Sequence, residues 1–194
     1  MGISSLVLFE KNKSISAKDL FNFIKTFCLQ QKLIFDYAEE RYEGQILKYI
    51  CLYISDKPFV HYDKRQISFS IYDEPYRNRT YNFKWDIEIE YFQAIISNDF
   101  DGNEDLLFKI MFAIVLKYPE AKLWIEEDWF YTLEDLKKIE KNKPFDMDWC
   151  YKNNFILFKK LCCELHSFLL FIKNSKKKKK PKNITRRQLL FSRT

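Results

Sequence analysis

The stretch Phe83-Lys84-Trp85-Asp86-Ile87-Glu88-Ile89-Glu90-Tyr91 alternates apolar and charged side chains without a break. Successive side chains of a β-strand point to opposite faces of the sheet, so this period predicts one strand with a core face and a solvent face. Residues 66–72 show the same period. The segment between them, residues 73–80, is turn-like, which predicts that the two strands form an antiparallel hairpin.

Three helices are predicted from their capping residues. Ser16, Asn103 and Thr132 each stand where a side-chain oxygen can accept a hydrogen bond from the first turn of a helix. Apolar side chains recur at three- and four-residue spacing after the first two, which gives each of those helices a buried face. The predicted helices span residues 17–29, 104–118 and 133–142, and further strands are predicted at residues 4–10, 32–37, 45–54 and 123–129.

These elements predict an α+β fold, with a mainly antiparallel sheet, helices packed on one face, a C-terminal helix and a disordered basic tail. A length of 194 residues suits one domain with a sizeable core. Glycine and proline are few, at 3 and 5, which argues against extensive disorder before the tail. We expect residues 1–172 to form a single α+β domain and residues 173–194 to form the tail.

The net charge of +6 comes from the tail alone. All 27 carboxylates and 23 of the 33 Lys and Arg residues precede position 173, so residues 1–172 are mildly acidic. A basic arm of this kind predicts an alternative function, as a nucleic-acid or membrane-surface accessory protein that binds through the tail. The basic residues that define it are Lys176, Lys177, Lys178, Lys179, Lys180, Arg186 and Arg187, beside Lys173, Lys182 and Arg193.

Residues 155–172 are rich in Phe, Leu and Ile, but charged side chains divide them, and the longest uninterrupted apolar run is residues 168–172. Since a bilayer requires roughly 20 apolar residues, we expect a helix docked on the core; an interfacial helix held at an anionic membrane by the tail is the alternative. The chain start lacks the pattern of a secretory signal. The odd number of cysteines, five, without a CxxC pair fits reduced thiols, so a cytoplasmic location is expected.

No catalytic residue, metal site or cofactor is predicted. The chain has only two histidines, His61 and His166, and the grouping of His166 with Cys162 and Cys163 lacks the second ligand pair of a zinc site. Three glycines cannot supply a phosphate-binding loop. Paired carboxylates are plentiful, and whether any pair is catalytic stays open, so an enzyme is a further alternative.

The predicted site is an acidic and aromatic segment within residues 120–149, which hold nine carboxylates and three of the four tryptophans. Aromatic anchors supply contact area, and carboxylates around them speed encounter with a basic partner. The competing interpretation is that Trp124 and Trp129 are core and the acids only keep a strand–helix corner soluble. The predicted partner-binding residues are Trp124, Glu126, Glu127, Asp128, Trp129, Tyr131, Glu134 and Asp135.

The segment Trp124-Ile125-Glu126-Glu127-Asp128-Trp129-Phe130-Tyr131-Thr132-Leu133-Glu134-Asp135-Leu136, within a small acidic α+β body, resembles small immunity-type proteins that bacteria encode beside polymorphic toxins. The resemblance covers about residues 1–150 and rests on the small, acidic α+β body and on this aromatic and acidic segment. The basic tail departs from it. The resemblance implies a stoichiometric inhibitor without catalysis, which occludes the active surface of a basic toxin domain. The sequence does not indicate an oligomeric state.

Overall fold

A computed structural model describes residues 4–41, 47–59, 65–73, 80–83, 86–98, 100–125 and 130–151. The chain divides into two compact units, Met1–Lys152 and Asn153–Thr194, and every described residue belongs to the first. The predicted C-terminal helix at residues 155–172 and the predicted tail at residues 173–194 lie outside the described residues.

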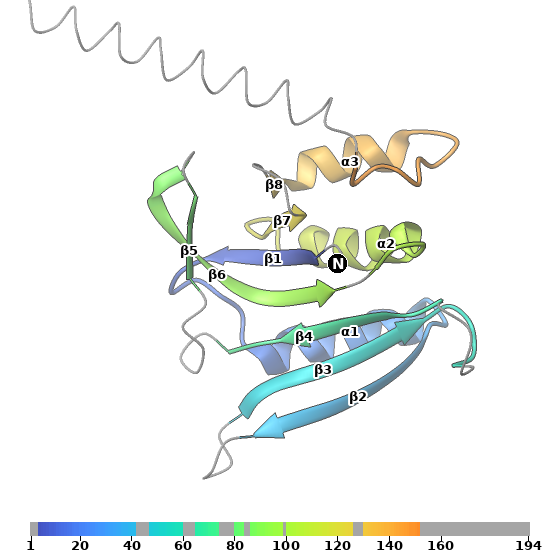
Figure 1. Cartoon of the computed structure of the whole chain (residues 1–194), viewed down its shortest axis with the longest axis horizontal. Helices are drawn as coiled ribbons and strands as arrows, with labels where there is room; N and C mark the ends of the chain where they lie inside the picture. The colour runs from blue at the N-terminus through green and yellow to red at the C-terminus, as the bar shows by residue number, and fades with distance from the viewer. Residues whose placement is uncertain are drawn as a thin grey trace, which may run out of the picture. The chain divides into compact units, whose positions relative to one another are not determined.

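One antiparallel sheet organises the first unit (Figure 1). Its strand order is β2-β3-β4-β6-β1-β7-β8, and β5 pairs with β6 beside this path. The predicted α+β class with a mainly antiparallel sheet is therefore confirmed. The strands are β1 Ser4–Glu10, β2 Ile34–Arg41, β3 Leu47–Ser55, β4 Ile67–Ile71, β5 Thr80–Phe83, β6 Asp86–Asn98, β7 Lys122–Ile125 and β8 Phe130–Tyr131.

The three helices described are α1 Ala17–Gln30, α2 Glu104–Lys117 and α3 Leu133–Lys141. The Oγ atom of Ser16 accepts from the Asp19 N–H at 3.1 Å, as the capping spacing predicts. Thr132 begins α3 with a complete capping box. Asn103 does stand at the N-cap of α2, but its side chain makes no capping hydrogen bond. All three predicted helices are thus confirmed, with ends that differ by a residue at most.

The first two helices cover the same face of the sheet. Strand pairing places one row of side chains across this helix-covered face: Tyr37, Leu52, Phe69, Ser97 and Ser5. The ring of Phe21 in α1 lies 4.8 Å from Tyr37 at one end of the row. Two positions beyond Val7 on the same face of β1, Phe9 packs edge-to-face on Tyr118, the C-cap residue of α2. The main core therefore lies between this face and the two helices.

The predicted hairpin is wrong in its boundaries and its register. The stretch that reads as one strand is divided, because β5 ends at Phe83 and β6 begins at Asp86, which is its partner. Strand β4 does lie antiparallel to β6, but it pairs with the far end, Ile71 opposite Ile95. Residues 91–95 are all buried, so this half of β6 runs through the middle of the sheet between β4 and β1. Because residues 91–95 are buried on both faces of the sheet, they do not alternate between apolar and charged side chains as residues 86–90 of the same strand do.

Candidate functional site

The structure describes only part of the predicted binding segment. Trp124 on β7 is half-buried and packs against a cluster of Leu6, Leu8 and Tyr91. Glu134 is exposed on α3, where Lys137 Nζ lies 3.2 Å from its Oε1. The other predicted contacts at residues 126–129, which are Glu126, Glu127, Asp128 and Trp129, lie outside the described residues, as do all the predicted basic residues of the tail.

Two predicted contact residues, Tyr131 and Asp135, are buried, with 3% and 2% of their surfaces exposed. The Tyr131 hydroxyl donates to the backbone carbonyl of Trp149 at 3.4 Å. The Oδ2 of Asp135 accepts from the N–H of Thr132 at 2.9 Å and from its hydroxyl at 2.8 Å, which closes the capping box of α3. Both side chains stabilise this corner of the fold and expose almost no surface to a partner, so neither belongs to the candidate site.

Trp149 is also a packing residue, with 4% of its surface exposed. Its Nε1–H donates to the backbone carbonyl of Glu104 at 3.0 Å, and its ring packs edge-to-face on Phe108. A buried indole with a satisfied N–H stabilises the fold. Of the two tryptophans that the competing interpretation places in the core, Trp124 keeps part of its surface in solvent and Trp129 lies outside the described residues.

The opposite face of the sheet carries the strongest candidate surface. We call it the helix-free face, because within the described part of the chain neither α1 nor α2 packs on it. Strand pairing aligns one row of its side chains across six strands, and at the β2 end these side chains are small. The row is Ala38, Cys51, Ser70, Ile96, Leu6 and Trp124, of which Leu6 is buried, with 3% of its surface exposed, and the others keep part of their surface in solvent.

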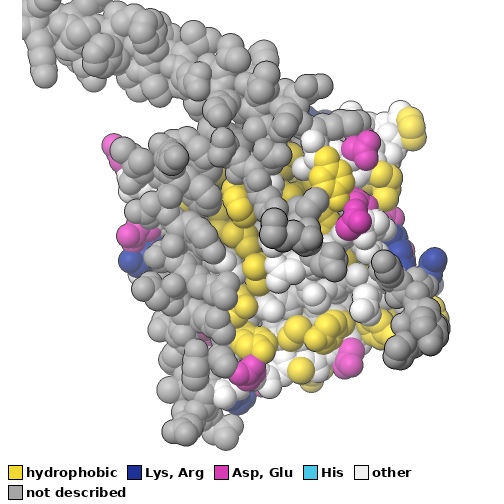
Figure 2. Space-filling view, viewed as in Figure 1, with side chains coloured by type: hydrophobic (Ala, Val, Ile, Leu, Met, Phe, Trp, Pro, Cys, Tyr) yellow, Lys and Arg dark blue, Asp and Glu magenta, His cyan; other side chains and the backbone are white. Residues whose placement is uncertain are grey.

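Tyrosines flank the small residues of this row. Tyr53, which is 39% exposed, and Tyr49 lie two positions to either side of Cys51, on the same face of β3. The Tyr49 ring packs edge-to-face on Tyr72, with centroids 5.9 Å apart. Figure 2 shows hydrophobic side chains exposed across the middle of the molecule in this view, with acidic side chains among them. The helix-free face thus combines aromatic side chains with small ones at its β2 end.

The described charges on the β2 and β3 part of this face are negative. Asp36 and Glu40 of β2 lie beside Tyr53 and Tyr49 in the strand register. A hydrogen bond to Glu40 raises the pKa of Tyr49, and a hydrogen bond to Cys51, with the nearby charge of Asp36, raises the pKa of Tyr53. Both phenols are therefore neutral at physiological pH. They offer rings and hydroxyls beside two carboxylates.

The positive charge of Lys122 on the same face is directed at rings. Its Nζ lies 4.4 Å from the centroid of Tyr91 and 4.2 Å from that of Phe130, and it donates to the Tyr91 hydroxyl. Such a cation–π arrangement holds the ammonium against the protein.

The two buried thiols among the described residues, Cys28 and Cys150, are not activated as nucleophiles. Burial raises the pKa of Cys28 to about 11 and that of Cys150 to about 12, so both are protonated at neutral pH. Over the described ranges, no three His, Cys, Asp or Glu side chains are grouped as metal ligands would be. His61, His166, Cys162 and Cys163 lie outside those ranges. Among the described helices, none has the length and apolar character needed to cross a membrane.

Sequence reasoning missed the tyrosines and the small residues of the helix-free face. A signal was present, because residues 49–54 alternate Tyr49, Cys51 and Tyr53 with three aliphatic side chains. All six are apolar by residue type, so the segment reads as a strand buried on both faces. Comparison of the chain with protein-family models, curated proteins and solved structures gives no match.

Proposed function

We propose that this protein is a non-catalytic binding module that docks on a positively charged protein through the helix-free face of its sheet. The observation that carries the proposal is the solvent-accessible part of this row, which is every member except the buried Leu6, with Tyr49 and Tyr53 beside it. Large rings next to small side chains form the kind of surface in which a few residues supply most of the binding energy.

Charge supports a basic partner. Asp36 and Glu40 stand at the β2 side of the row, and residues 1–172 as a whole carry more carboxylates than basic side chains. Carboxylates around an aromatic centre raise the association rate with a cationic surface and orient it. Exposed Glu134 on α3 would add to the same long-range attraction.

The finer proposal is that the module is a cytoplasmic immunity protein whose partner is a cognate toxin domain. It is supported by the resemblance of residues 1–150 to such proteins and by the acidic character of residues 1–172. Inhibition would then come from occlusion of the toxin surface, in a complex of one inhibitor to one toxin, and would require no chemistry from this chain.

Paired variants on the two faces test the docking surface. We expect Tyr53→Ala and Trp124→Ala each to weaken binding about ten-fold or more, since buried aromatic anchors contribute at least about 1.4 kcal/mol. Leu116→Ala is the matched control, because Leu116 is 53% exposed on α2. The binding partner is sought first as the product of the neighbouring open reading frame, by co-expression and isothermal titration. Equal affinity of all three variants would reject the helix-free face as the docking surface.

A second function is proposed for the tail because the ten basic residues of positions 173–194 are separated from every carboxylate of the chain. Such a segment binds nucleic acid or anionic lipid with strong salt dependence. Replacement of Lys176, Lys177, Lys178, Lys179 and Lys180 by Gln should abolish salt-sensitive retention on DNA, RNA or anionic vesicles. The same variant should keep the affinity for the protein partner, which separates the two functions.

A further inference from the structure

The β2 strand, Ile34–Arg41, stands at one end of the strand order and pairs, among the described residues, with β3 alone. Figure 1 draws it as the outermost strand, with no labelled element beyond it. None of its eight side chains is buried. An edge strand of this length offers a row of backbone N–H and C=O groups to which another extended segment can add.

The outward backbone groups can be identified from Tyr37. Its N–H donates to the Oδ1 atom of Asp36 at 2.8 Å, so this N–H does not point to β3. In an antiparallel strand the N–H and C=O of one residue point the same way, and the direction alternates along the chain. The outer edge is therefore formed by Phe35, Tyr37 and Glu39, while their neighbours bond to β3.

The two faces of this edge differ in charge. Asp36 and Glu40 point to the helix-free face, beside Tyr53 and Tyr49. On the helix-covered face, Tyr37 packs on Phe21 and is 45% exposed.

Charges on the helix-covered side are balanced, in contrast. Lys25 Nζ lies 5.8 Å from the centroid of the Tyr37 ring, and Glu39 forms an ion pair with Arg41. A strand added here would thus meet carboxylates on one side and an exposed ring on the other.

The acidic side chains also argue against a second copy of this chain as the occupant. Antiparallel pairing of β2 with a second copy brings Asp36 opposite Glu40 of that copy if it is centred on Ala38, and diagonally next to Asp36 and Glu40 of that copy if it is centred on Tyr37. Like charges directly opposite each other destabilise a strand pair. The carboxylate of Asp36 on the Tyr37 N–H further shields the middle of the edge, in the way that natural edge strands avoid self-association.

We propose that β2 accepts an extended segment of the partner as an added antiparallel strand, and that this segment alternates Lys or Arg with apolar residues. The basic side chains lie toward Asp36 and Glu40, and the apolar ones pack beside Tyr37. The inference rests on the proposed protein-binding role and adds to it a second contact, at the sheet edge. On binding, the Asp36 carboxylate leaves the Tyr37 N–H and pairs with an incoming cation.

A synthetic peptide of alternating Lys and Val, about eight residues long to match β2 and blocked at both ends, is the probe. In antiparallel addition, the residues opposite Phe35, Tyr37 and Glu39 share their face, so the Val amides point to the edge. N-methylation of the Val amides should weaken binding about ten-fold or more, because it removes the ladder hydrogen bonds. N-methylation of the Lys amides should leave affinity unchanged, although the charge of both peptides is the same.

Matched variants of the full chain provide the second measurement. Glu39→Pro removes an outward N–H, whereas Glu39→Ala removes the same charge and keeps the N–H. We expect the proline variant to bind the unmodified peptide about ten-fold more weakly than the alanine variant. Fluorescence anisotropy gives the affinities, and circular dichroism checks that both variants are folded. If Glu39→Pro does not fold, the comparison of methylated peptides on the unaltered protein decides alone.

Equal affinity of the two methylated peptides, loss of affinity on Lys methylation instead, or absence of binding by the unmodified peptide would overturn strand addition. Equal affinity would identify plain electrostatic adsorption. These outcomes do not affect the role of the helix-free face, which is measured separately by Tyr53→Ala and Trp124→Ala with the protein partner.

Discussion

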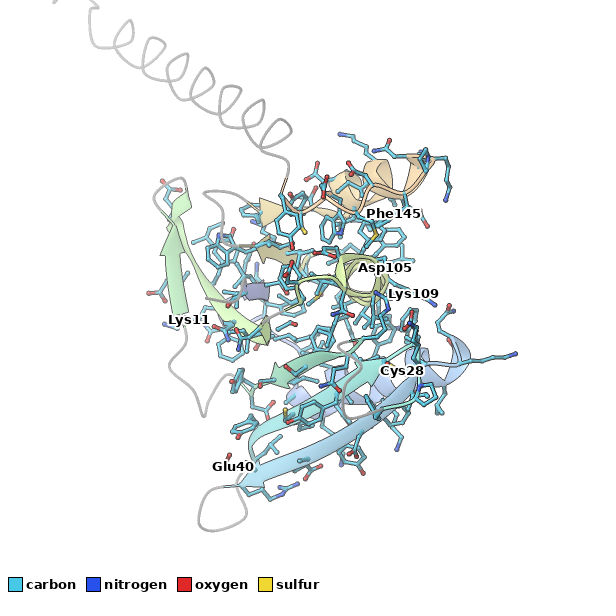
Figure 3. The ribbon with its side chains drawn as sticks, turned by 45° about the vertical axis from the view of Figure 1, so that its right-hand side comes forward. Lys11, Cys28, Glu40, Asp105, Lys109 and Phe145 are labelled. Atoms are coloured by element: carbon cyan, nitrogen blue, oxygen red, sulfur yellow. The ribbon has the colours of Figure 1, made fainter. Side chains whose placement is uncertain are left out.

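The guanidinium group of Arg65 forms a bidentate ion pair with the carboxylate of Asp105, with Nη1 at 2.7 Å from Oδ1 and Nη2 at 2.6 Å from Oδ2. The same group donates from Nε and Nη2 to Asp56, at 3.0 and 2.9 Å. Arg65 stands just before β4, Asp56 just after β3, and Asp105 in the first turn of α2. One side chain therefore joins the end of a strand hairpin to a helix, close to the sheet that carries the candidate site (Figure 3 labels Asp105).

Loss of the ion pairs that Arg65 forms with Asp56 and Asp105, called the Arg65 clamp below, should lower the stability of the fold. We expect Arg65→Ala to reduce the free energy of unfolding by about 1–2 kcal/mol, a moderate value because both carboxylates are more than a third exposed. Arg65→Lys keeps the positive charge but cannot form the bidentate hydrogen bonds of a guanidinium group. It should therefore recover less than half of the unfolding free energy that Arg65→Ala loses. Urea denaturation measures both. A change under about 0.3 kcal/mol for Arg65→Ala would show that solvent replaces the clamp fully.

The same clamp predicts a stability difference that depends on pH. Hydrogen bonds from Arg65 lower the pKa of Asp56 and of Asp105 below the ordinary value of 3.8. A lowered folded-state pKa stabilises the protein above the unfolded pKa, and this contribution is lost as pH falls through the folded value. The difference in unfolding free energy between wild type and Arg65→Ala should thus be constant above about pH 5 and decrease below about pH 4. A difference that grows on acidification would contradict this assignment.

Thiol labelling should report on the helix-free face. Cys51 is half-buried in the row of small residues, whereas burial raises the pKa of Cys28 and Cys150. Under native conditions a maleimide should label Cys51 much faster than the other two, as peptide mapping by mass spectrometry resolves. Bound partner should then slow labelling of Cys51. Unchanged labelling in a saturated complex would place the docking surface elsewhere.

Two neighbouring acids of α3 should separate stability from association. Asp135→Ala breaks the capping box and should cost about 0.5–2 kcal/mol of unfolding free energy, without a direct effect on the association rate. Glu134→Ala should leave stability within about 0.5 kcal/mol, because its pair with Lys137 is exposed. It should slow association at low salt if the partner is basic. Stopped-flow kinetics and thermal melts compare the variants, and the reverse pattern would refute the assignment of roles.

The helices were predictable because their signals are local. A cap side chain such as Ser16 and the residue it bonds, Asp19, are three positions apart, so the sequence itself holds the whole interaction. The strands were also recognisable, since an alternation or an apolar run is read within a few residues. The end of β5 at Phe83, the start of β6 at Asp86 and the pairing of Ile71 with Ile95 were missed, because register depends on residues that are distant along the chain.

The candidate site shows the same limit. Trp124 and Glu134 were recognised by residue type, and that criterion could not distinguish them from Tyr131 and Asp135, which the fold uses internally. Exposure depends on what packs against a side chain, and the buried contact of Tyr131 lies 18 positions away at Trp149. Residue type therefore identifies candidates, and packing selects among them.

The sequence by itself determined the class of fold, the three helices with their starting residues, and the separation of a basic C-terminal segment from a mildly acidic body. Only the tertiary structure decided which face of the sheet the helices cover, and that β2 stands at its edge. The reason is physical: capping, periodicity and charge are set within a few residues. The helix-free row from Ala38 to Trp124, by contrast, exists only once six strands pair in register.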